Sequence, residues 1–179
     1  KGQSIEDIKE SESRHFHYKI DLTDFNKTSE IINFIEPDLI VNFAAESHVD
    51  RSFRNSILFT KTNTLGAHIF FQTCLEKKVK KIVQVSTDEV YGEKLSGSFS
   101  EKNQLNPTNP YSASKASSDH LVKAWFHTYD LPCIISNCSN NYGPWQYPEK
   151  LIPKIISKAI QKQKIPIYGT GKNVRDWLY

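Results

Sequence analysis

The sequence predicts an α/β domain built on a doubly wound parallel sheet. Short apolar runs at 39–43, 81–86 and 132–136 are typical of strands buried on both faces. Stretches with helical spacing separate these runs, and parallel neighbours need such crossover connections. In a sheet of this kind, ligands bind beyond the carboxyl ends of the strands. Polar residues follow the runs at those positions, in segments 21–22, 44–51, 87–92 and 137–143.

The first part of the chain is predicted to alternate helix and strand. Ser4, followed by apolar and acidic residues, predicts a short capped helix. Alternation of side-chain types over 15–20 predicts a strand. Isoleucines at helical spacing predict a helix over 24–36, which Pro37 ends. The apolar run 39–43 then supplies a buried strand.

The middle of the chain continues the alternation. A long helix is expected over 59–77, and the run 81–86 is the next strand. A loop rich in Gly, Ser, Asn and Pro follows over 91–109. Proline in the first turn opens a helix over 110–129, and 132–136 repeats the strand pattern.

The last part is predicted to be richer in turns. A turn-rich segment, 137–148, leads to a helix over 151–163. Two short strands, 165–168 and 174–179, complete the chain and are separated by glycines. We expect one partial domain over 1–179, in which residues from about 138 to 179 begin a smaller lobe.

The composition is that of an ordinary globular protein. Its 179 residues are 38% hydrophobic and 24% charged, enough for one compact domain. The formal net charge of +3 gives no reason to expect nucleic acid or an anionic membrane as a partner. No apolar run approaches about 18 residues and no secretory signal is visible, so we expect no membrane span and a cytoplasmic location.

Two further counts bear on the kind of protein this is. The chain has no Met and starts at Lys1, so we expect a piece of a longer protein. Cys74, Cys133 and Cys138 form no CxxC pair, and we expect them to be reduced thiols.

Tyr111 and Lys115 are the first candidates for chemistry. They are four residues apart near the start of the predicted helix 110–129, so they share one helix face. A nearby ammonium favours the phenolate, which would lower the tyrosine pKa and allow Tyr111 to act as a base near neutral pH. An exposed pair on an ordinary helix has the same spacing.

Thr87, Asp88 and Glu89 stand directly after the second apolar run, where ligands are expected. Neighbouring side chains of a strand point to opposite faces. Both carboxylates can therefore serve one substrate only if the chain leaves strand geometry here, and Tyr91 and Gly92 offer a place for the turn. A solvated turn is the alternative.

The chain closely resembles the dTDP-glucose 4,6-dehydratase family of short-chain dehydrogenase/reductases. All short-chain dehydrogenase/reductases share Tyr-x-x-x-Lys, whereas Asp-Glu after Ser-Thr distinguishes these dehydratases from sugar epimerases. The resemblance covers nearly the whole chain and implies a Rossmann-like fold with the start of a substrate-binding lobe. It rests on segments 43–52, 86–92, 111–121, 137–144, 148–153, 166–169 and 175–179.

This resemblance implies a reaction. Tyr111, assisted by Lys115 and Thr87, would remove the proton of the sugar 4-hydroxyl while hydride passes from C4 to NAD. Glu89 would then take the C5 proton and Asp88 would protonate the departing 6-hydroxyl. Water would leave before the hydride returns to C6.

The resemblance also implies binding residues. Besides Tyr111 and Lys115, the NAD contacts would be Asp21, Leu22, Phe43, Ala44, Ala45, Glu46, Ser47, Thr62 and Asn141. The nucleotide sugar, dTDP-glucose, would be held by Ser47, Thr87, Asn140, Lys150, Leu151, Pro166, Ile167, Tyr168 and Arg175.

The family pattern is incomplete in this chain. None of the seven glycines forms the G-x-x-G-x-x-G turn that follows the first strand in the family, and the sequence stops before the remaining sugar-binding segments. A related epimerase or decarboxylase, a UDP-sugar dehydratase and a non-catalytic association module remain alternatives. The resemblance implies a homodimer built on helices 59–77 and 110–129. No metal is expected, because His15 and His17 have no acidic or cysteine partner at metal-site spacing.

Overall fold

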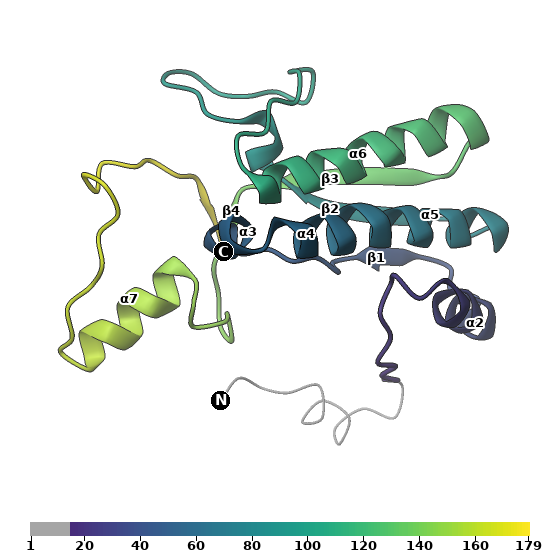
Figure 1. The fold of residues 1–179 in the computed structure, drawn as a ribbon, viewed down its shortest axis with the longest axis horizontal. Coiled ribbons are helices and arrows are strands. Elements are labelled where there is room, and N and C mark those ends of the chain that lie inside the picture. Colours follow the sequence, from purple (N-terminus) through teal and green to yellow (C-terminus); the bar gives the residue numbers. More distant parts are fainter. Residues whose placement is uncertain (1–14) are drawn as a thin grey trace. The chain divides into compact units, whose positions relative to one another are not determined.

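The computed structural model describes residues 15–179, which form two compact units (Figure 1). One unit spans 18–138, and the other contains 139–179 together with residues 15–17. The helix predicted from Ser4 lies outside the described residues.

A three-stranded parallel sheet forms the centre of unit 18–138. It consists of β1 (Ile40–Asn42), β2 (Ile82–Thr87) and β3 (Cys133–Cys138), in the order β1-β2-β3. The three apolar runs therefore form parallel strands, as predicted. Because the strands run in the same direction, the residues that follow β1, β2 and β3 emerge at one edge of the sheet.

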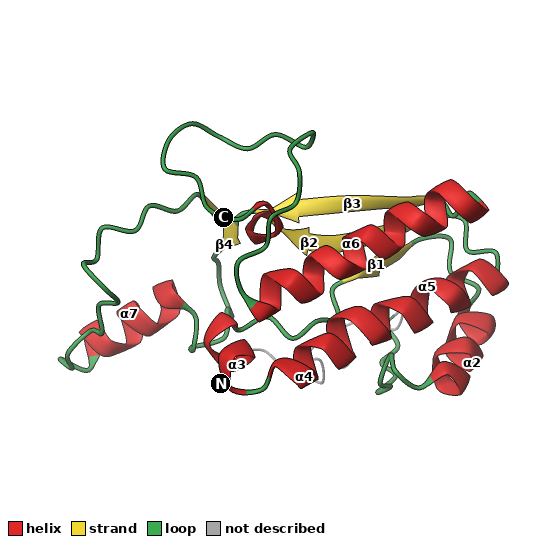
Figure 2. Cartoon of the chain, turned by 45° about the horizontal axis from the view of Figure 1, so that its top comes forward, coloured by secondary structure: helices red, strands yellow, loops and turns green. Residues whose placement is uncertain are grey.

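One layer of helices covers this sheet. It contains α2 (Phe25–Ile35), α5 (Ala67–Glu76) and α6 (Pro110–Tyr129) (Figure 2). The core between helices and strands is built from buried apolar residues that include Phe71, Ile82, Val122 and Leu131. Burying each such side chain contributes about 1.5–3 kcal/mol.

Local signals set the ends of two of these helices. The Asp24 side chain accepts a hydrogen bond from the Lys27 amide and so begins α2. Asn109 caps α6 in a capping box, and Pro110 occupies the first turn, where its missing N–H costs nothing. The helix predicted over 110–129 is thereby confirmed to the residue.

The helix expected over 59–77 is more complex than predicted. It begins earlier, as α4 (Ser56–Phe59), continues as a π-helix, η1 (Thr60–Gly66), and ends as α5. A further short helix, α3 (Val49–Arg54), occupies what the sequence suggested was a polar segment. π-turns are rare and occur mostly at functional sites.

Two predicted strands are wrong. Residues 15–20 are irregular, and so are 165–168. A strand needs a neighbour for its backbone hydrogen bonds, and within the described residues neither segment has one. In unit 139–179, β4 (Asn140–Asn141) instead pairs with β5 (Trp177–Leu178). The helix α7 (Leu151–Ile160) lies between these two strands in the sequence.

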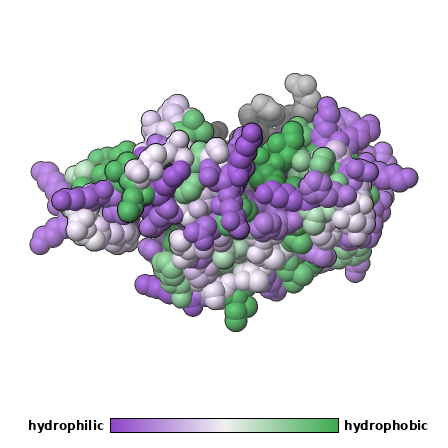
Figure 3. Space-filling model, turned by 90° about the horizontal axis from the view of Figure 1, so that it is seen from above, coloured by the Kyte–Doolittle hydropathy of each residue, from purple (hydrophilic) through white to green (hydrophobic). Residues whose placement is uncertain are grey.

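Large apolar side chains also reach the surface. Phe43, Phe53 and Ile57 of unit 18–138 are each more than three-fifths exposed. On the face drawn in Figure 3, hydrophobic patches lie among hydrophilic side chains. Exposed patches of this kind mark surfaces that contact a ligand or another chain.

Candidate active site

The carboxyl end of β2 carries the first part of the site. Thr87 is the last residue of the strand, and Asp88–Tyr91 form a 3₁₀ helix, η2, directly after it. The Thr87 hydroxyl accepts a hydrogen bond from the Glu89 amide at 3.3 Å, which caps η2. The chain thus leaves strand geometry at Asp88, as a shared role for both carboxylates requires.

The first turn of α6 brings Tyr111 to the same place. A side-chain hydrogen bond joins Tyr111 to Thr87, and the charges of Glu89 and Asp88 act on the Tyr111 phenol. Tyr111 is 9% exposed and packs edge-on against Phe59. The structure therefore gathers Thr87, both carboxylates and Tyr111, residues that the sequence places in two separate segments.

The electrostatics of Tyr111 differ from the expectation. Burial, followed by the negative charge of Glu89, raises its pKa to about 12, and the Thr87 hydrogen bond only partly offsets this. The prediction that Lys115 lowers this pKa is wrong. The Lys115 ammonium instead donates to the Val85 carbonyl oxygen at 2.7 Å, so it is tied to the strand.

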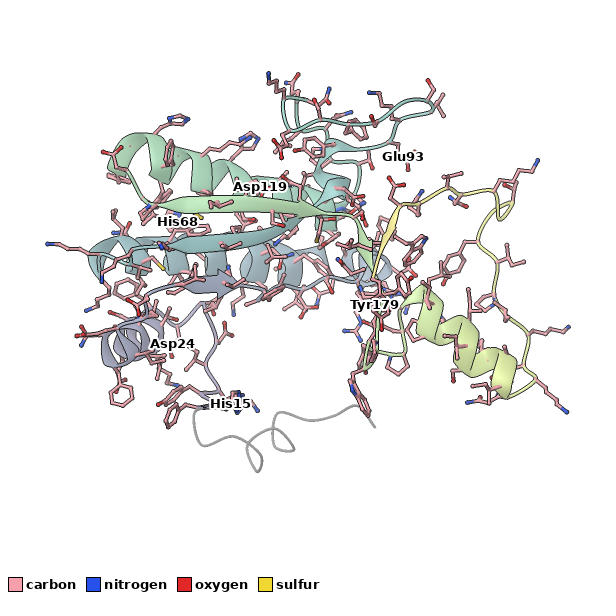
Figure 4. The ribbon with its side chains drawn as sticks, turned by 180° about the vertical axis from the view of Figure 1, so that it is seen from behind. His15, Asp24, His68, Glu93, Asp119 and Tyr179 are labelled. Atoms are coloured by element: carbon pink, nitrogen blue, oxygen red, sulfur yellow. The ribbon has the colours of Figure 1, made fainter. Side chains whose placement is uncertain are left out.

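Lys115 has a buried acidic neighbour on the same helix face. Asp119 is 1% exposed and lies between α6 and the strands (Figure 4). Its carboxylate accepts hydrogen bonds from Ser86 at 2.6 Å and Asn137 at 3.4 Å. Burial raises the pKa of Asp119, and burial lowers the pKa of Lys115 while the Asp119 charge opposes that lowering. Sequence reasoning missed Asp119, although its spacing of four from Lys115 was a usable signal.

The loop after β1 is held by two asparagines. The Asn42 side chain accepts from the Ala44 amide at 3.1 Å. Asn63, in the π-helix, accepts from the Glu46 amide at 2.8 Å and donates to the Glu46 carbonyl oxygen and the Ser114 hydroxyl, each at 2.9 Å. The segment predicted to line NAD, 43–47, is thus pinned between β1 and α6. No pattern in the sequence indicates the role of either asparagine.

Other predicted cofactor residues of this unit are placed as follows. Asp21 is exposed and accepts hydrogen bonds from the Thr23 amide and hydroxyl, which lower its pKa. Leu22 packs against the core cluster. Thr62 lies in the π-helix, one residue before Asn63.

The remaining predicted binding residues belong to unit 139–179. Asn140 and Asn141 form β4, and Lys150 is the residue before α7, which Leu151 begins. Pro166, Ile167, Tyr168 and Arg175 are exposed. Their meeting with Tyr111 around one ligand stays a prediction.

Two kinds of feature are absent from the described residues. Across 15–179, no cluster of three His, Cys, Asp or Glu side chains could hold a metal ion. No helix in the same range has the length and apolar character needed to cross a membrane.

Comparison with known proteins gives consistent matches. The model of a family described as GDP-mannose 4,6 dehydratase matches residues 2–179. A probable dTDP-glucose 4,6-dehydratase from Sinorhizobium fredii is 46% identical over 171 residues, which are 90% of this chain and 49% of the relative. A dTDP-glucose 4,6-dehydratase from Shigella flexneri is 42% identical over 99% of this chain and 54% of its own length. The chain thus spans about half the length of the curated relatives it matches.

Solved structures agree. DesIV, a dTDP-glucose 4,6-dehydratase from Streptomyces venezuelae solved with NAD and TYD bound, superposes with a TM-score of 0.91 at 43% identity. The match covers 94% of this chain and 52% of DesIV. A UDP-glucuronic acid 4-epimerase from Bacillus cereus gives a TM-score of 0.89 at 26% identity, over 96% of this chain and 54% of the epimerase. These matches confirm the incomplete Rossmann-like fold and the predicted resemblance, and the chain belongs to the family described as GDP-mannose 4,6 dehydratase.

Proposed function

We propose that the protein containing this chain is an NAD-dependent nucleotide-sugar 4,6-dehydratase that converts dTDP-glucose to dTDP-4-keto-6-deoxyglucose and water. The observation that carries the proposal is the convergence of Thr87, Asp88 and Glu89 on the phenol of Tyr111. Relatives named as dTDP-glucose 4,6-dehydratases, at 42–46% identity, support the same reaction.

The residues of this chain fit part of an NAD site. Asn63 links the backbone of loop 43–47 to Ser114 of α6, the helix that also carries Tyr111 and Lys115. Asp21 and Leu22 would contact the adenine end of NAD. Thr62 and Asn141 complete the proposed contacts. When bound, NAD would supply a hydride acceptor and a positive charge that favours the Tyr111 phenolate.

Oxidation at C4 is the first step that the side chains support. Tyr111 would take the proton of the sugar 4-hydroxyl as hydride leaves C4, and the Thr87 hydroxyl would orient the phenol through their hydrogen bond. Lys115, held by the Val85 carbonyl, would keep a positive charge below the tyrosine. The product of this step is a 4-keto sugar.

Elimination follows because the ketone acidifies the proton at C5. Glu89 would take that proton, and Asp88 would donate a proton to the departing 6-hydroxyl, so that water leaves. The two carboxyls must then differ in protonation, which interacting acids in different surroundings can achieve. The hydride from C4 would be added at C6, and the proton on Glu89 would return to C5. The proton that Tyr111 gained balances the one that Asp88 gave up, and exchange through solvent would reset both groups.

The nucleotide sugar would be held mainly by the second unit. Lys150 and Arg175 are suited to a diphosphate, because fixed cations form strong charge-assisted hydrogen bonds with it. The other proposed contacts are Ser47, Thr87, Asn140, Leu151, Pro166, Ile167 and Tyr168.

Separate Asp88→Asn and Glu89→Gln changes in the intact protein test this function. Incubation with dTDP-glucose should give the alkali-sensitive keto product with the unchanged enzyme, and each variant should lose at least about 100-fold of that rate. An epimerase would keep most of its turnover in both variants. Parallel reactions with UDP-glucose show which nucleotide sugar the enzyme prefers. A protein that converts neither dTDP-glucose nor UDP-glucose would be a non-catalytic module.

We also propose a homodimer in the cytoplasm. α5 and α6 lie side by side, and Phe126 and Tyr129 of α6 are about half exposed, which suits a symmetric helical contact. The three free cysteines suit a reducing compartment. Light scattering of the intact protein should give twice the mass of one chain, and Phe126→Glu should shift it toward the monomer.

A further inference from the structure

We infer that Asn109 is a positioning residue that both begins α6 and orients the carboxylate of Glu89. The inference rests on the proposed function, in which Glu89 takes the proton from C5. It starts from one side chain that makes two hydrogen bonds, one to the helix and one to the carboxylate.

The helix cap decides which way the Asn109 amide faces. Its Oδ1 accepts a hydrogen bond from the Ser112 backbone amide at 2.9 Å, and the Asn109 backbone amide in turn donates to the Ser112 hydroxyl. An asparagine amide has an acceptor on one branch and donors on the other. With Oδ1 committed to the cap, Nδ2 must point away from the helix, and it donates to Oε2 of Glu89 at 3.2 Å.

The backbone beneath Glu89 is already held. The Gly92 amide donates to the Glu89 carbonyl oxygen at 3.1 Å, and the Asn106 amide donates to the Val90 carbonyl oxygen at 2.9 Å. The freedom that remains is rotation of the Glu89 side chain, which is only partly buried. The Asn109 donor restricts that rotation.

This arrangement ties both reacting groups to one turn of helix. Tyr111 lies two residues after Asn109, in the first turn of α6. The same capped end of the helix therefore positions both the Tyr111 phenol and the Glu89 carboxylate. Removal of a carbon-bound proton is sensitive to the placement of the base, and a misplacement of about 1 Å can cost about 100-fold in rate. Asn109 would therefore affect the elimination step, while C4 oxidation depends on Tyr111.

Two substitutions separate the cap from the carboxylate contact. Asn109→Ser keeps an N-cap acceptor but cannot reach Glu89, and Asn109→Asp keeps the acceptor but replaces the N–H donor with a second carboxylate. The Glu89 charge acts on the titratable Tyr111 phenol, and the Asp88 charge acts on the same phenol. The matched control is Asn55→Ser, because Asn55 caps α4 in the same way, through the Leu58 amide.

The intact enzyme would be assayed with dTDP-glucose and with its C5-deuterated form. We expect both Asn109 variants to keep the melting temperature and the KM for dTDP-glucose. Their kcat should fall by about 10- to 100-fold, with reduced cofactor accumulating and a larger isotope effect at C5. The aspartate variant should regain rate as the pH is lowered, because protonation of the added carboxylate removes its repulsion. Asn55→Ser should behave like the unchanged enzyme.

A wild-type elimination rate in Asn109→Ser would overturn the inference, and so would an equal slowing of C4 oxidation and elimination. The proposed function is judged separately, on the unchanged enzyme and Glu89→Gln. If the unchanged enzyme forms no keto product, or Glu89→Gln forms it normally, the proposed function fails. If those two behave as expected and Asn109→Ser is normal, only the role of Asn109 fails.

Discussion

At the scale of single residues, the buried carboxylate of Asp119 is the most unusual feature of α6. It lies within the core layer of unit 18–138, where its partners are the neutral Ser86 and Asn137 side chains and, through space, the Lys115 and Lys123 charges. Hydrogen bonds compensate only part of the cost of burying a charge. The raised pKa of Asp119 expresses the remaining cost.

Asp119→Asn should therefore change how stability depends on pH. A carboxyl whose folded pKa is raised binds more protons when folded than when unfolded, so the free energy of unfolding falls as pH rises above the ordinary value of 3.8. Asparagine removes that dependence. In urea unfolding of the intact protein, the free energy of unfolding of the variant should rise relative to that of wild type between acidic and neutral pH. If the free energy of unfolding of wild type instead rose relative to that of the variant over this pH range, the raised pKa of Asp119 would be contradicted.

Burial also makes the three cysteines differ in their reactivity. It raises the pKa of Cys74 to about 12 and that of Cys133 to about 11, and the thiolate is the reactive form. In the folded protein at mildly alkaline pH, Cys74 should resist alkylation until the protein unfolds, whereas half-buried Cys138 should react first. Peptide mapping after timed alkylation measures this order. Equal labelling of Cys74 and Cys138 would show that the core opens readily.

At the scale of elements, η2 depends on the glycine that ends it. Gly92 has φ of +85°, and a Cβ there would clash with the Asn106 carbonyl oxygen. Gly92→Ala should destabilise the protein by about 1–3 kcal/mol and slow elimination, because η2 carries Asp88 and Glu89. Gly97 is the matched control: its φ is +77°, but the nearest atom to a Cβ is 3.9 Å away, on the Lys94 side chain. Thermal melts of both variants should therefore show the larger loss at Gly92.

The π-helix η1 supports the loop after β1 through Asn63. Asn63→Ala would remove the side-chain partners of the Glu46 amide and carbonyl oxygen. Leaving such groups without partners costs about 1–3 kcal/mol. We expect a lower melting temperature together with a raised KM for NAD, measured by steady-state kinetics of the intact enzyme. An unchanged KM for NAD would mean that loop 43–47 does not contact the cofactor.

At the scale of the whole molecule, the chain contains the strand ends and the helix of the proposed active site but no glycine-rich turn. That turn sets a helix N-terminus against the cofactor diphosphate. The 179-residue polypeptide alone should therefore bind NAD weakly, although it carries Tyr111 and Lys115. Calorimetric titration of this polypeptide tests the point. Micromolar affinity would show that loop 43–47 and α6 suffice for binding.

The sequence predicted elements well where short-range signals decide them. The bounds of α6 follow from Asn109 and Pro110 at its start, and β1, β2 and β3 follow from apolar runs. The strands predicted at 15–20 and 165–168 are absent, because alternation alone cannot supply a neighbouring strand. The π-helix was not predicted either, and its Asn63 bonds residues 17 and 51 positions away, which no local pattern indicates.

The family resemblance implied the meeting of Tyr111 with the Thr87 segment. By itself, the sequence determined the parallel α/β architecture and the helix that carries Tyr111 and Lys115. Periodicity, caps and the common edge of parallel strands are sufficient for these. Only the tertiary structure decided which groups surround those residues: Asp119 under Lys115, Asn63 on the loop after β1, and Asn109 on Glu89. Burial and hydrogen bonds between distant segments exist only once the chain has folded, so the protonation and orientation of the site follow from the fold.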